Sequence, residues 1–255
     1  TKMPRSITDL PNDDRTNGWS ALAGPRQPRP SLQGDLDVDW VIVGAGYAGL
    51  AAARQLALQQ PDATIAVVEA GVVGENASGR NSGFTIDLPH SSSPSDAAVE
   101  KGRSVIRVNR FAVDALDRLV AEHGIACDWN KRGRYHVAVT DDVAAQSLAP
   151  YARNLDAWGE SYEYLERAAL RDRLGTDYYA AAVYTPGTHL LNPAALVRGL
   201  ADSLPSQVQL FERSPVIETE FKGASPYVRT AKGSIRARKL ILAVNAFSQS
   251  FGVYG

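Results

Sequence analysis

Three stretches near the start of the chain have the hydrophobic patterns of a strand, a helix and a second strand. Residues 38–43 are rich in valine and isoleucine, residues 50–56 are strong helix formers that stop before Pro61, and residues 64–68 form another β-branched run. This order predicts a βαβ unit with parallel strands. Near the end of the chain, residues 239–244 form an apolar run without alternation, which predicts a strand buried on both faces of a parallel sheet.

A long amphipathic helix is expected over residues 95–122, where Gly124 is placed to end it. One side of this helix is apolar, and three arginines share another side, which we expect to be a solvated stripe. The apolar positions are Val105, Val108, Ala112, Leu116 and Leu119, and the arginines are Arg103, Arg107 and Arg110.

The rest of the chain predicts shorter elements. Residues 1–36 hold five of the fourteen prolines and no apolar periodicity, so we expect an arm laid over the domain. Residues 128–189 have short alternating segments typical of a second, sheet-based domain. Pro193 begins a predicted helix that runs to residue 204. Short strands are expected around residues 208–211, 216–220, 227–230 and 235–237.

The composition is that of an ordinary globular chain. The 255 residues carry a net charge of −1 and are 44% hydrophobic, which gives no electrostatic reason to expect nucleic acid or a membrane surface. No apolar run approaches the roughly 20 residues of a membrane span. The single cysteine, Cys127, predicts a buried structural thiol and fits a cytoplasmic location. The four histidines have no metal-ligand spacing, so no metal is expected; they are His90, His123, His136 and His189.

The segment Gly44-Ala45-Gly46-Tyr47-Ala48-Gly49 directly follows the first predicted strand and opens the predicted helix. Its first glycine permits a tight turn, its second lets a pyrophosphate approach the backbone, and its third lets the helix pack closely on the sheet. Glu69 ends the next strand, where a carboxylate can accept hydrogen bonds from both ribose hydroxyls and would repel a 2′-phosphate. These residues predict a dinucleotide site that disfavours NADP, with the helix N-terminus at the phosphates.

A second loop of small residues, Ala77-Ser78-Gly79-Arg80-Asn81-Ser82-Gly83, follows soon after Glu69. Such a loop can turn successive N–H groups and hydroxyls toward an anion, and Arg80 adds positive charge. An NAD enzyme does not need a second loop here, whereas a flavin nucleotide extended across the domain does. The sequence therefore favours FAD. An NAD-dependent dehydrogenase and a surface turn without a ligand remain alternatives.

Four stretches together resemble the FAD-dependent D-amino-acid oxidase superfamily, of the glycine/D-amino-acid oxidase type. In motif the chain is most similar to the branch of γ-glutamylputrescine oxidoreductase and related amine oxidases, and it matches their N-terminal portion. The stretches are residues 36–39, 41–50, 77–83 and 191–200. The resemblance implies an α/β fold (α+β overall), with a Rossmann-like βαβ FAD-binding domain and an incomplete sheet-based substrate domain. The expected boundaries are an arm over 1–36, a discontinuous FAD-binding domain over 37–127 and 190–255, and part of the substrate domain over 128–189.

The resemblance also implies contacts to FAD. They are Gly44, Gly46, Ala48 and Gly49 for the pyrophosphate, Glu69 for the adenosine ribose, Ser78, Arg80, Asn81, Ser82 and Gly83 for the phosphate and flavin side, Val216 for adenine, and Ala243 and Asn245 at the last strand and turn. Two positions depart from the branch pattern. Ser82 stands where a second glycine is common, and Phe84 stands where a polar residue is usual. We expect Phe84 to face the flavin or the substrate channel.

The activity that the resemblance implies is oxidation of a C–N bond in an amine or amino acid to an imine, by hydride transfer to flavin and reoxidation by O2 or a quinone. A neutral amine can donate hydride without a dedicated base, so no catalytic residue is assigned. The alternative is a non-catalytic flavin-binding subunit of a hetero-oligomer.

Members of the superfamily continue beyond the position of Gly255 with more substrate-domain strands and a segment that covers the flavin. We therefore expect this chain to work with a complementary C-terminal polypeptide, either cleaved from it or separately encoded. At the other end, Met3 is the only methionine, and we expect it to be the native start.

Overall fold

The computed structural model describes residues 2–14, 16–89, 96–222 and 225–253. The chain divides into two compact units, and each is described by itself. Unit 1 contains residues 1–82, 123–127 and 192–255, and unit 2 contains residues 83–122 and 128–191. The expected division placed residues 96–122 with the FAD-binding residues, whereas they lie in unit 2. The assignment of a function to each unit stays a prediction.

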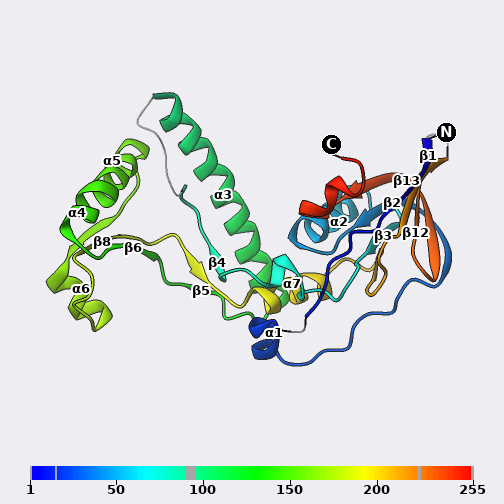
Figure 1. Ribbon diagram of the computed structural model, residues 1–255, viewed down its shortest axis with the longest axis horizontal. Coiled ribbons are helices and arrows are strands. Elements are labelled where there is room, and N and C mark those ends of the chain that lie inside the picture. Colours follow the sequence, from blue (N-terminus) through cyan, green and yellow to red (C-terminus); the bar gives the residue numbers. More distant parts are fainter. Residues whose placement is uncertain (1, 15, 90–95, 223–224, 254–255) are drawn as a thin grey trace. The chain divides into compact units, whose positions relative to one another are not determined.

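Unit 1 is built on a seven-stranded sheet with the order β1-β11-β12-β13-β2-β3-β10 (Figure 1). Neighbouring strands are parallel from β13 to β10 and antiparallel from β1 to β13. The elements of unit 1 are β1 (Lys2–Ser6), α1 (Gly18–Ala23), β2 (Gly34–Val43), α2 (Tyr47–Gln59), β3 (Ile65–Val68), the 3-10 helix η1 (Ala77–Gly79), α7 (Pro193–Asp202), β10 (Val208–Phe211), β11 (Glu218–Lys222), β12 (Ser225–Arg229), β13 (Gly233–Leu242) and the 3-10 helix η3 (Asn245–Gln249).

The predicted βαβ unit is confirmed as β2, α2 and β3. All four residues of β3 are buried, and β2 pairs with it in parallel from Trp40 to Val43. The residues that α2 buries are small or branched, which lets the helix lie close to the sheet; they are Gly49, Leu50, Ala53 and Ala57. This packing places the N-terminus of α2 directly beyond the end of β2.

The first 36 residues contain more regular structure than the sequence predicted. β1 forms the edge of the sheet and pairs antiparallel with β11, with an irregular register between Lys2 and Arg5, where Pro4 lies. An edge strand can be held by backbone hydrogen bonds without apolar alternation, and a proline is tolerated there. The pattern of hydrophobic residues therefore gave no signal for β1. The short helix α1 and the first residues of β2 also lie in this stretch.

The last strand of the sheet also differs from the expectation. Two strands were predicted around 235–237 and 239–244, but β13 runs without interruption from Gly233 to Leu242. The charged residues in its middle are exposed, and Arg236 forms an ion pair with Asp37 on the neighbouring strand β2, with which β13 pairs along its length. Residues 240–242 are only half-buried, so the expectation of burial on both faces was wrong.

Unit 2 contains two three-stranded antiparallel sheets, with the orders β4-β9-β5 and β6-β8-β7. The second sheet packs with helices in a core that includes Leu148, Leu155, Trp158 and Val183. The elements of unit 2 are β4 (Phe84–Thr85), α3 (Asp96–His123), β5 (Asn130–Lys131), β6 (Arg134–Ala138), α4 (Asp141–Val143), the π-helix η2 (Ala144–Leu148), α5 (Ala149–Trp158), β7 (Glu163–Glu166), α6 (Arg167–Leu174), β8 (Ala181–Thr185) and β9 (His189–Leu190).

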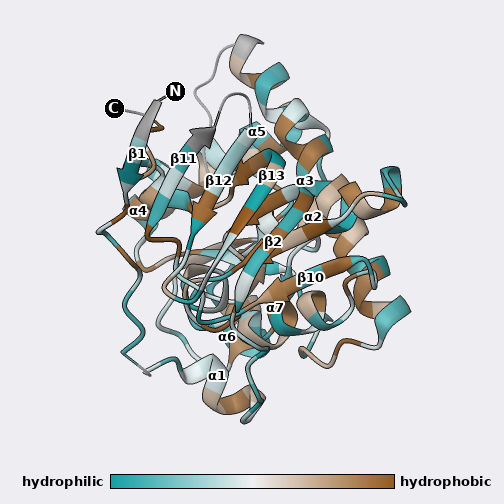
Figure 2. Ribbon diagram, turned by 90° about the vertical axis from the view of Figure 1, so that its right-hand side faces the viewer, coloured by the Kyte–Doolittle hydropathy of each residue, from teal (hydrophilic) through white to brown (hydrophobic). Residues whose placement is uncertain are grey.

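Helix α3 confirms the predicted long helix, but its buried side is not the predicted apolar side. Ile106 is buried, and a side chain at Gly102 would meet the Trp158 indole at 2.3 Å, so the helix packs through this side. Val108 and Phe111 are 67% and 72% exposed. Hydrophobic and hydrophilic positions both occur along α3 (Figure 2). A small residue that allows a tryptophan to approach carries no hydrophobic signal, which explains the error.

The arginines of α3 were predicted to be a solvated stripe, and Arg110 is exposed as predicted but also forms ion pairs that the sequence did not predict. Its guanidinium lies between two carboxylates, donating to buried Asp87 at 3.1 Å and to Glu160 at 3.0 Å. The hydrogen bond to Glu160 is the largest cause of a raised pKa of Arg110, and Asp87 raises it further. Arg110 thus ties α3 to the segments that contain Asp87 and Glu160.

Candidate functional site

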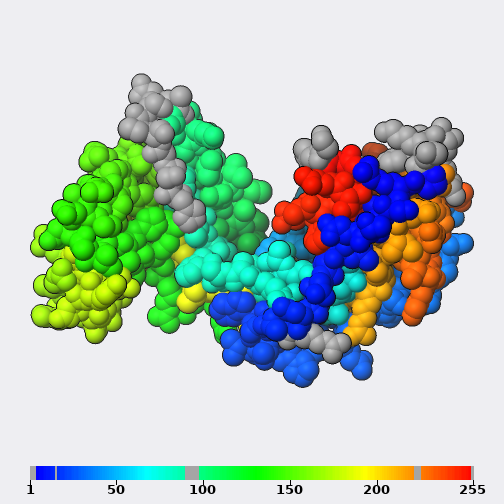
Figure 3. Space-filling view, in the orientation of Figure 1, coloured from blue at the N-terminus to red at the C-terminus, as the bar shows by residue number. Residues whose placement is uncertain are grey.

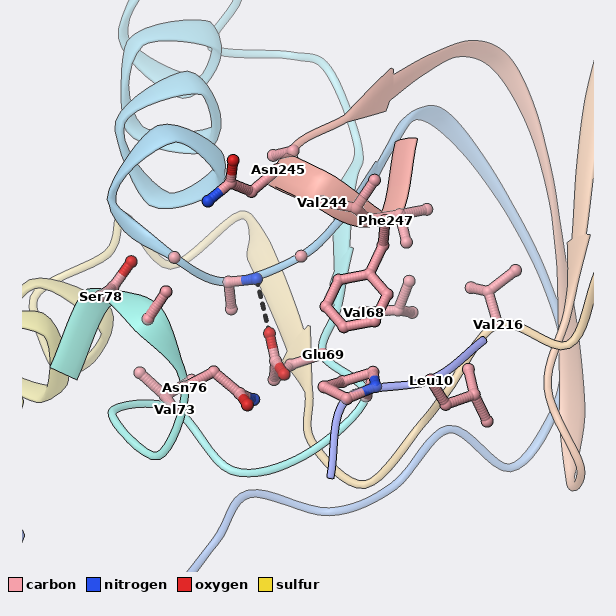
Figure 4. A pocket seen from close by; sticks show the side chains of 18 of the residues that line it. Leu10, Val68, Glu69, Val73, Asn76, Ser78, Val216, Val244, Asn245 and Phe247 are labelled. Atoms are coloured by element: carbon pink, nitrogen blue, oxygen red, sulfur yellow. Dashed lines mark hydrogen bonds between the residues drawn. The ribbon is translucent and has the colours of Figure 1, made fainter. Parts of the chain in front are cut away.

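A cavity of about 400 Å³ lies in unit 1 at the carboxyl ends of β2, β3 and β13 (Figure 4). Its walls come from the turns that follow these three strands, from residues 72–78, and from two segments distant in the sequence, residues 9–12 and 243–251. Ligands of parallel α/β sheets bind beyond the carboxyl ends of the strands. A volume of this size lies within the range of small-molecule pockets, roughly 300–1,000 Å³.

The glycine-rich turn at Gly44 and Gly46 forms one wall of the cavity. Gly44 has φ +101°, and a Cβ there would lie 2.5 Å from the Ala243 carbonyl oxygen. A Cβ at Gly46 would lie 2.7 Å from Ser78 Oγ. Gly46 caps α2 without a side-chain hydrogen bond, and the first turn has no acidic residue. The backbone and the positive end of the helix dipole are therefore accessible to an anion.

Glu69 follows β3 and is 9% exposed at the cavity. The Ala45 N–H donates to its Oε2 at 2.8 Å, as the dashed line in Figure 4 shows, and the Gly71 N–H donates to its Oε1 at 3.0 Å. These two bonds fix the carboxylate. Each carboxylate oxygen can accept a further hydrogen bond, so Glu69 can still bind hydroxyl groups.

The second loop faces the turn through Ser78. Its Oγ accepts a hydrogen bond from the Tyr47 N–H at 3.2 Å, at the start of α2. Val73 and Asn76, which precede this loop in the sequence, line the cavity, and Figure 4 shows them on the side of the cavity where Ser78 lies. The Ser78 hydroxyl, the Asn76 amide and the N-terminus of α2 therefore lie close together and form the polar part of the cavity.

The opposite side of the cavity is apolar. Val216, which is 3% exposed, lines this side of the cavity together with Val68, Val244 and Phe247 (Figure 4). Asn245 has φ +49° and turns the chain out of β13. A polar end and an apolar end in one cavity suit a ligand that carries phosphates and a flat ring system.

The structure brings together part of the predicted set. The predicted residues that line the cavity are Gly44, Gly46, Glu69, Ser78, Val216, Ala243 and Asn245. Those that do not line it are Ala48, Gly49, Arg80, Asn81, Ser82 and Gly83. Gly49 instead packs against the turn, where a Cβ would lie 1.9 Å from the Gly44 carbonyl oxygen. The contacts of all these residues to FAD stay predictions.

Arg80 and Asn81 make contacts within the protein. Arg80 donates to the Glu75 carbonyl oxygen and to Asp14, both at 2.7 Å. Asn81 donates to the Ser78 carbonyl oxygen at 2.9 Å and also bonds to Tyr47, whose pKa is raised to about 12 mainly by burial. Gly83 and Phe84 belong to unit 2, where Phe84 is 45% exposed in β4.

Sequence reasoning missed the cavity residues that come from the ends of the chain. Residues 9–12 of the arm line it, as do Phe247 and Phe251. No motif marks them, and the proline content of the arm was the only available signal. Cys127, predicted to be a structural thiol, is buried as expected. Within the described residues, no three histidine, cysteine or acidic side chains form a metal-ligating group, and no helix is long and apolar enough to cross a bilayer. His90 lies outside the described residues.

Comparison with protein families decides the class of this chain. Residues 39–254 match the family of FAD dependent oxidoreductases. The chain belongs to this family. The alternative of an NAD-dependent dehydrogenase is therefore not supported.

Two curated relatives cover most of the chain. The gamma-glutamylputrescine oxidoreductase of Escherichia coli is 30% identical over 90% of this chain and 54% of its own length. The probable oxidoreductase OrdL of Haemophilus influenzae is 28% identical over 82% of this chain and 49% of its own length. The chain thus spans about half the length of these relatives.

Solved structures share the fold. The glycine oxidase from Geobacillus kaustophilus matches with a TM-score of 0.69 at 22% identity, over 85% of this chain and 58% of that one. The L-amino acid deaminase from Proteus myxofaciens matches with a TM-score of 0.67 at 19% identity, over 88% of this chain and 48% of that one. These likenesses confirm the predicted fold class.

Proposed function

We propose that this chain binds FAD in the cavity of unit 1 and forms the cofactor-binding part of an enzyme that oxidises a C–N bond of an amine or amino acid to an imine. The observation that carries the proposal is the fixed Glu69 carboxylate at the end of β3, facing a helix N-terminus without an acidic residue in the same cavity. When bound, FAD accepts a hydride from the carbon that bears the amine and is reoxidised by O2 or a quinone.

The residues of the chain would hold and orient the cofactor. The glycine turn at Gly44 and Gly46, which lines the cavity without a Cβ, would hold the pyrophosphate near the N-terminus of α2. Glu69 would accept hydrogen bonds from the ribose hydroxyls through its remaining lone pairs. Val216 and its apolar neighbours would contact the adenine and exclude water from it. We assign no proton-transfer residue.

We also propose that a complementary polypeptide completes the enzyme, acting from the cytoplasm on a small amine. The curated relatives are about twice as long as the matched region, which supports a further part. The exposed apolar residues Val108 and Phe111 of α3 support a contact with that part. A lone band of the mass of this chain in active, flavin-loaded protein on a denaturing gel would refute this part of the proposal.

The first experiment is the visible absorption spectrum of the purified protein before and after acid precipitation. Flavin absorbance in the supernatant would support non-covalent FAD, and colour in the pellet would indicate a covalent link. A peroxide-coupled screen with amines would follow. A protein that stays colourless after incubation with FAD would contradict the proposal.

A variant of Glu69 tests its role. Glu69→Ala should weaken FAD binding by about 1.5–3 kcal/mol for each hydrogen bond lost to a charged acceptor. Fluorescence titration with FAD measures this, and Glu122→Ala, an exposed substitution on α3, serves as the matched control. An equal dissociation constant in Glu69→Ala and the wild type would exclude the role given to this carboxylate.

A further inference from the structure

We infer that the N-terminal arm contributes to the nucleotide site. Its Asn17 is a positioning residue that fixes the conformation of the loop over residues 74–81. This inference rests on the proposed function, because it concerns the same cavity. Neither the dinucleotide fingerprint nor the match over residues 39–254 includes the arm.

Asn17 joins the two turns of the loop. It is 8% exposed, and its amide nitrogen donates to the Gly74 carbonyl oxygen at 2.8 Å and to the Gly79 carbonyl oxygen at 3.2 Å. The two turns touch closely, since a Cβ at Gly79 would lie 1.9 Å from the Gly74 oxygen. The amide nitrogen, which also donates to Ser20 Oγ at 2.9 Å, therefore serves the carbonyl groups of both turns. Unpaired buried carbonyl groups would favour a different loop conformation.

Other contacts of the arm act on the same loop. The Trp19 indole N–H donates to the Asn81 carbonyl oxygen at 2.9 Å. Asp14 forms an ion pair with Arg80 at 2.7 Å, and hydrogen bonds from Thr16 and Arg80 lower the pKa of Asp14 to about 2. Figure 3 shows the arm in blue on the surface, in contact with the cyan loop.

The loop in turn places groups at the cavity. Ser78 lies one residue before Gly79 and accepts the hydrogen bond from the Tyr47 N–H at the start of α2. Asn76 lies between the two turns and lines the cavity. Leu10 and Asn12 of the arm themselves form part of the cavity wall. Movement of the arm would therefore displace both the loop that faces the phosphates and one wall.

Two substitutions separate this role from a general structural one. The Asn17 oxygen also accepts from the Trp19 N–H and caps α1. Asn17→Ser keeps an oxygen that can cap the helix but removes the amide donors, and Asn17→Ala removes both. Gln33→Ala is the control, because Gln33 is an exposed amide of the arm whose side chain bonds to Ser31.

The readouts are FAD affinity and local hydrogen exchange. Both Asn17 variants should raise the dissociation constant for FAD by about tenfold or more, which corresponds to the loss of two hydrogen bonds. They should also speed amide exchange over residues 74–81 in the protein without FAD, while exchange in β3 stays unchanged. Gln33→Ala should match the wild type in both measurements.

The outcomes are distinguishable. Wild-type affinity and wild-type exchange in Asn17→Ser would overturn the inference. If the Asn17 variants do not fold, the wild type carries the test: FAD should slow exchange at residues 9–12 and 17–19 as well as at 44–49, and no protection of the arm would overturn the inference. A wild type that binds no FAD would refute the proposed function, whereas faster loop exchange in Asn17→Ser would still establish the contact between arm and loop.

Discussion

Two buried carboxylates at the ends of neighbouring strands in unit 1 have different surroundings. Glu212, after β10, is completely buried, forms an ion pair with Arg26 and accepts from the Arg29 N–H and from the Val73 N–H, the latter at 2.6 Å. Glu69, after β3, is held by two N–H groups and faces the cavity. The Glu212 carboxylate is therefore neutralised by Arg26 and held by backbone N–H groups within the protein, whereas the Glu69 carboxylate is accessible to a ligand in the cavity.

Removing the Glu212 carboxylate should destabilise unit 1 strongly. Glu212→Ala leaves a partly buried guanidinium and two N–H groups without their acceptor, so the free energy of unfolding should fall by about 3–5 kcal/mol. Urea denaturation measures this loss, and Glu122→Ala on the surface of α3 should stay close to the wild type. A change below 1 kcal/mol would mean that water replaces the lost contacts.

Tyr47 should make the stability of unit 1 sensitive to alkaline pH. Burial raises its pKa to about 12 in the folded chain, whereas a tyrosine in the unfolded chain has a pKa of about 10. The folded state then keeps a proton that the unfolded state releases, so this contribution to stability is complete below pH 10 and is lost as the pH rises through about 12.

The Tyr47→Phe variant tests this dependence. Between pH 10 and 12 its free energy of unfolding should fall less steeply than that of the wild type, as measured by urea denaturation at several pH values. Tyr178→Phe, at a position that is 68% exposed, should keep the wild-type slope. Parallel curves for Tyr47→Phe and the wild type would show that the phenol is solvated.

At the scale of elements, the contact between α2 and the turn after β2 depends on Gly49. Gly49→Ala should lower the free energy of unfolding by about 1–3 kcal/mol or more, because the new methyl group would meet the Gly44 backbone rather than a movable side chain. The same substitution at Gly18 of α1 meets nothing within 4 Å and should not lower the free energy of unfolding. Thermal denaturation compares the two, and equal melting temperatures would contradict the close packing.

The elements that the sequence predicted correctly are those whose own residues carry the signal. The β-branched run of β3 and the glycines before α2 are local patterns, and both were found. The edge strand β1 is held by pairing with β11, which lies more than two hundred residues away, so no local pattern marks it. In the same way, the packing of α3 depends on Trp158 from another helix.

The same distinction applies to the candidate site. Glu69 and Gly46 lie in a motif that predicts them, and the structure places them at one cavity. Residues 9–12 lie in the sequence between β1, which pairs with β11, and Asn17, which bonds to Gly74. Their place depends on tertiary structure, which residue type and spacing do not encode.

At the scale of the whole molecule, each unit has its own hydrophobic core, so calorimetry should resolve two unfolding transitions. FAD should raise the unfolding temperature of unit 1 alone, because a ligand stabilises the part that binds it. At a concentration one hundred times its dissociation constant, FAD should increase the free energy of unfolding of unit 1 by about 2.7 kcal/mol. Truncation of the Trp158 side chain should lower the other transition and identify it. A single transition that shifts as a whole would show that the units unfold together.

The parallel pairing of β2 with β13 joins residues 34–43 to residues 233–242. All of unit 2 lies between these strands in the sequence, as does the last parallel strand, β10. During synthesis, unit 2 is therefore complete while β2 and β3 still lack their outer neighbours. Open strand edges are sites of incorrect pairing between chains. The nascent polypeptide is most vulnerable to aggregation in this interval, which ends only when residues 208–211 and 233–242 have emerged from the ribosome and paired with β3 and β2.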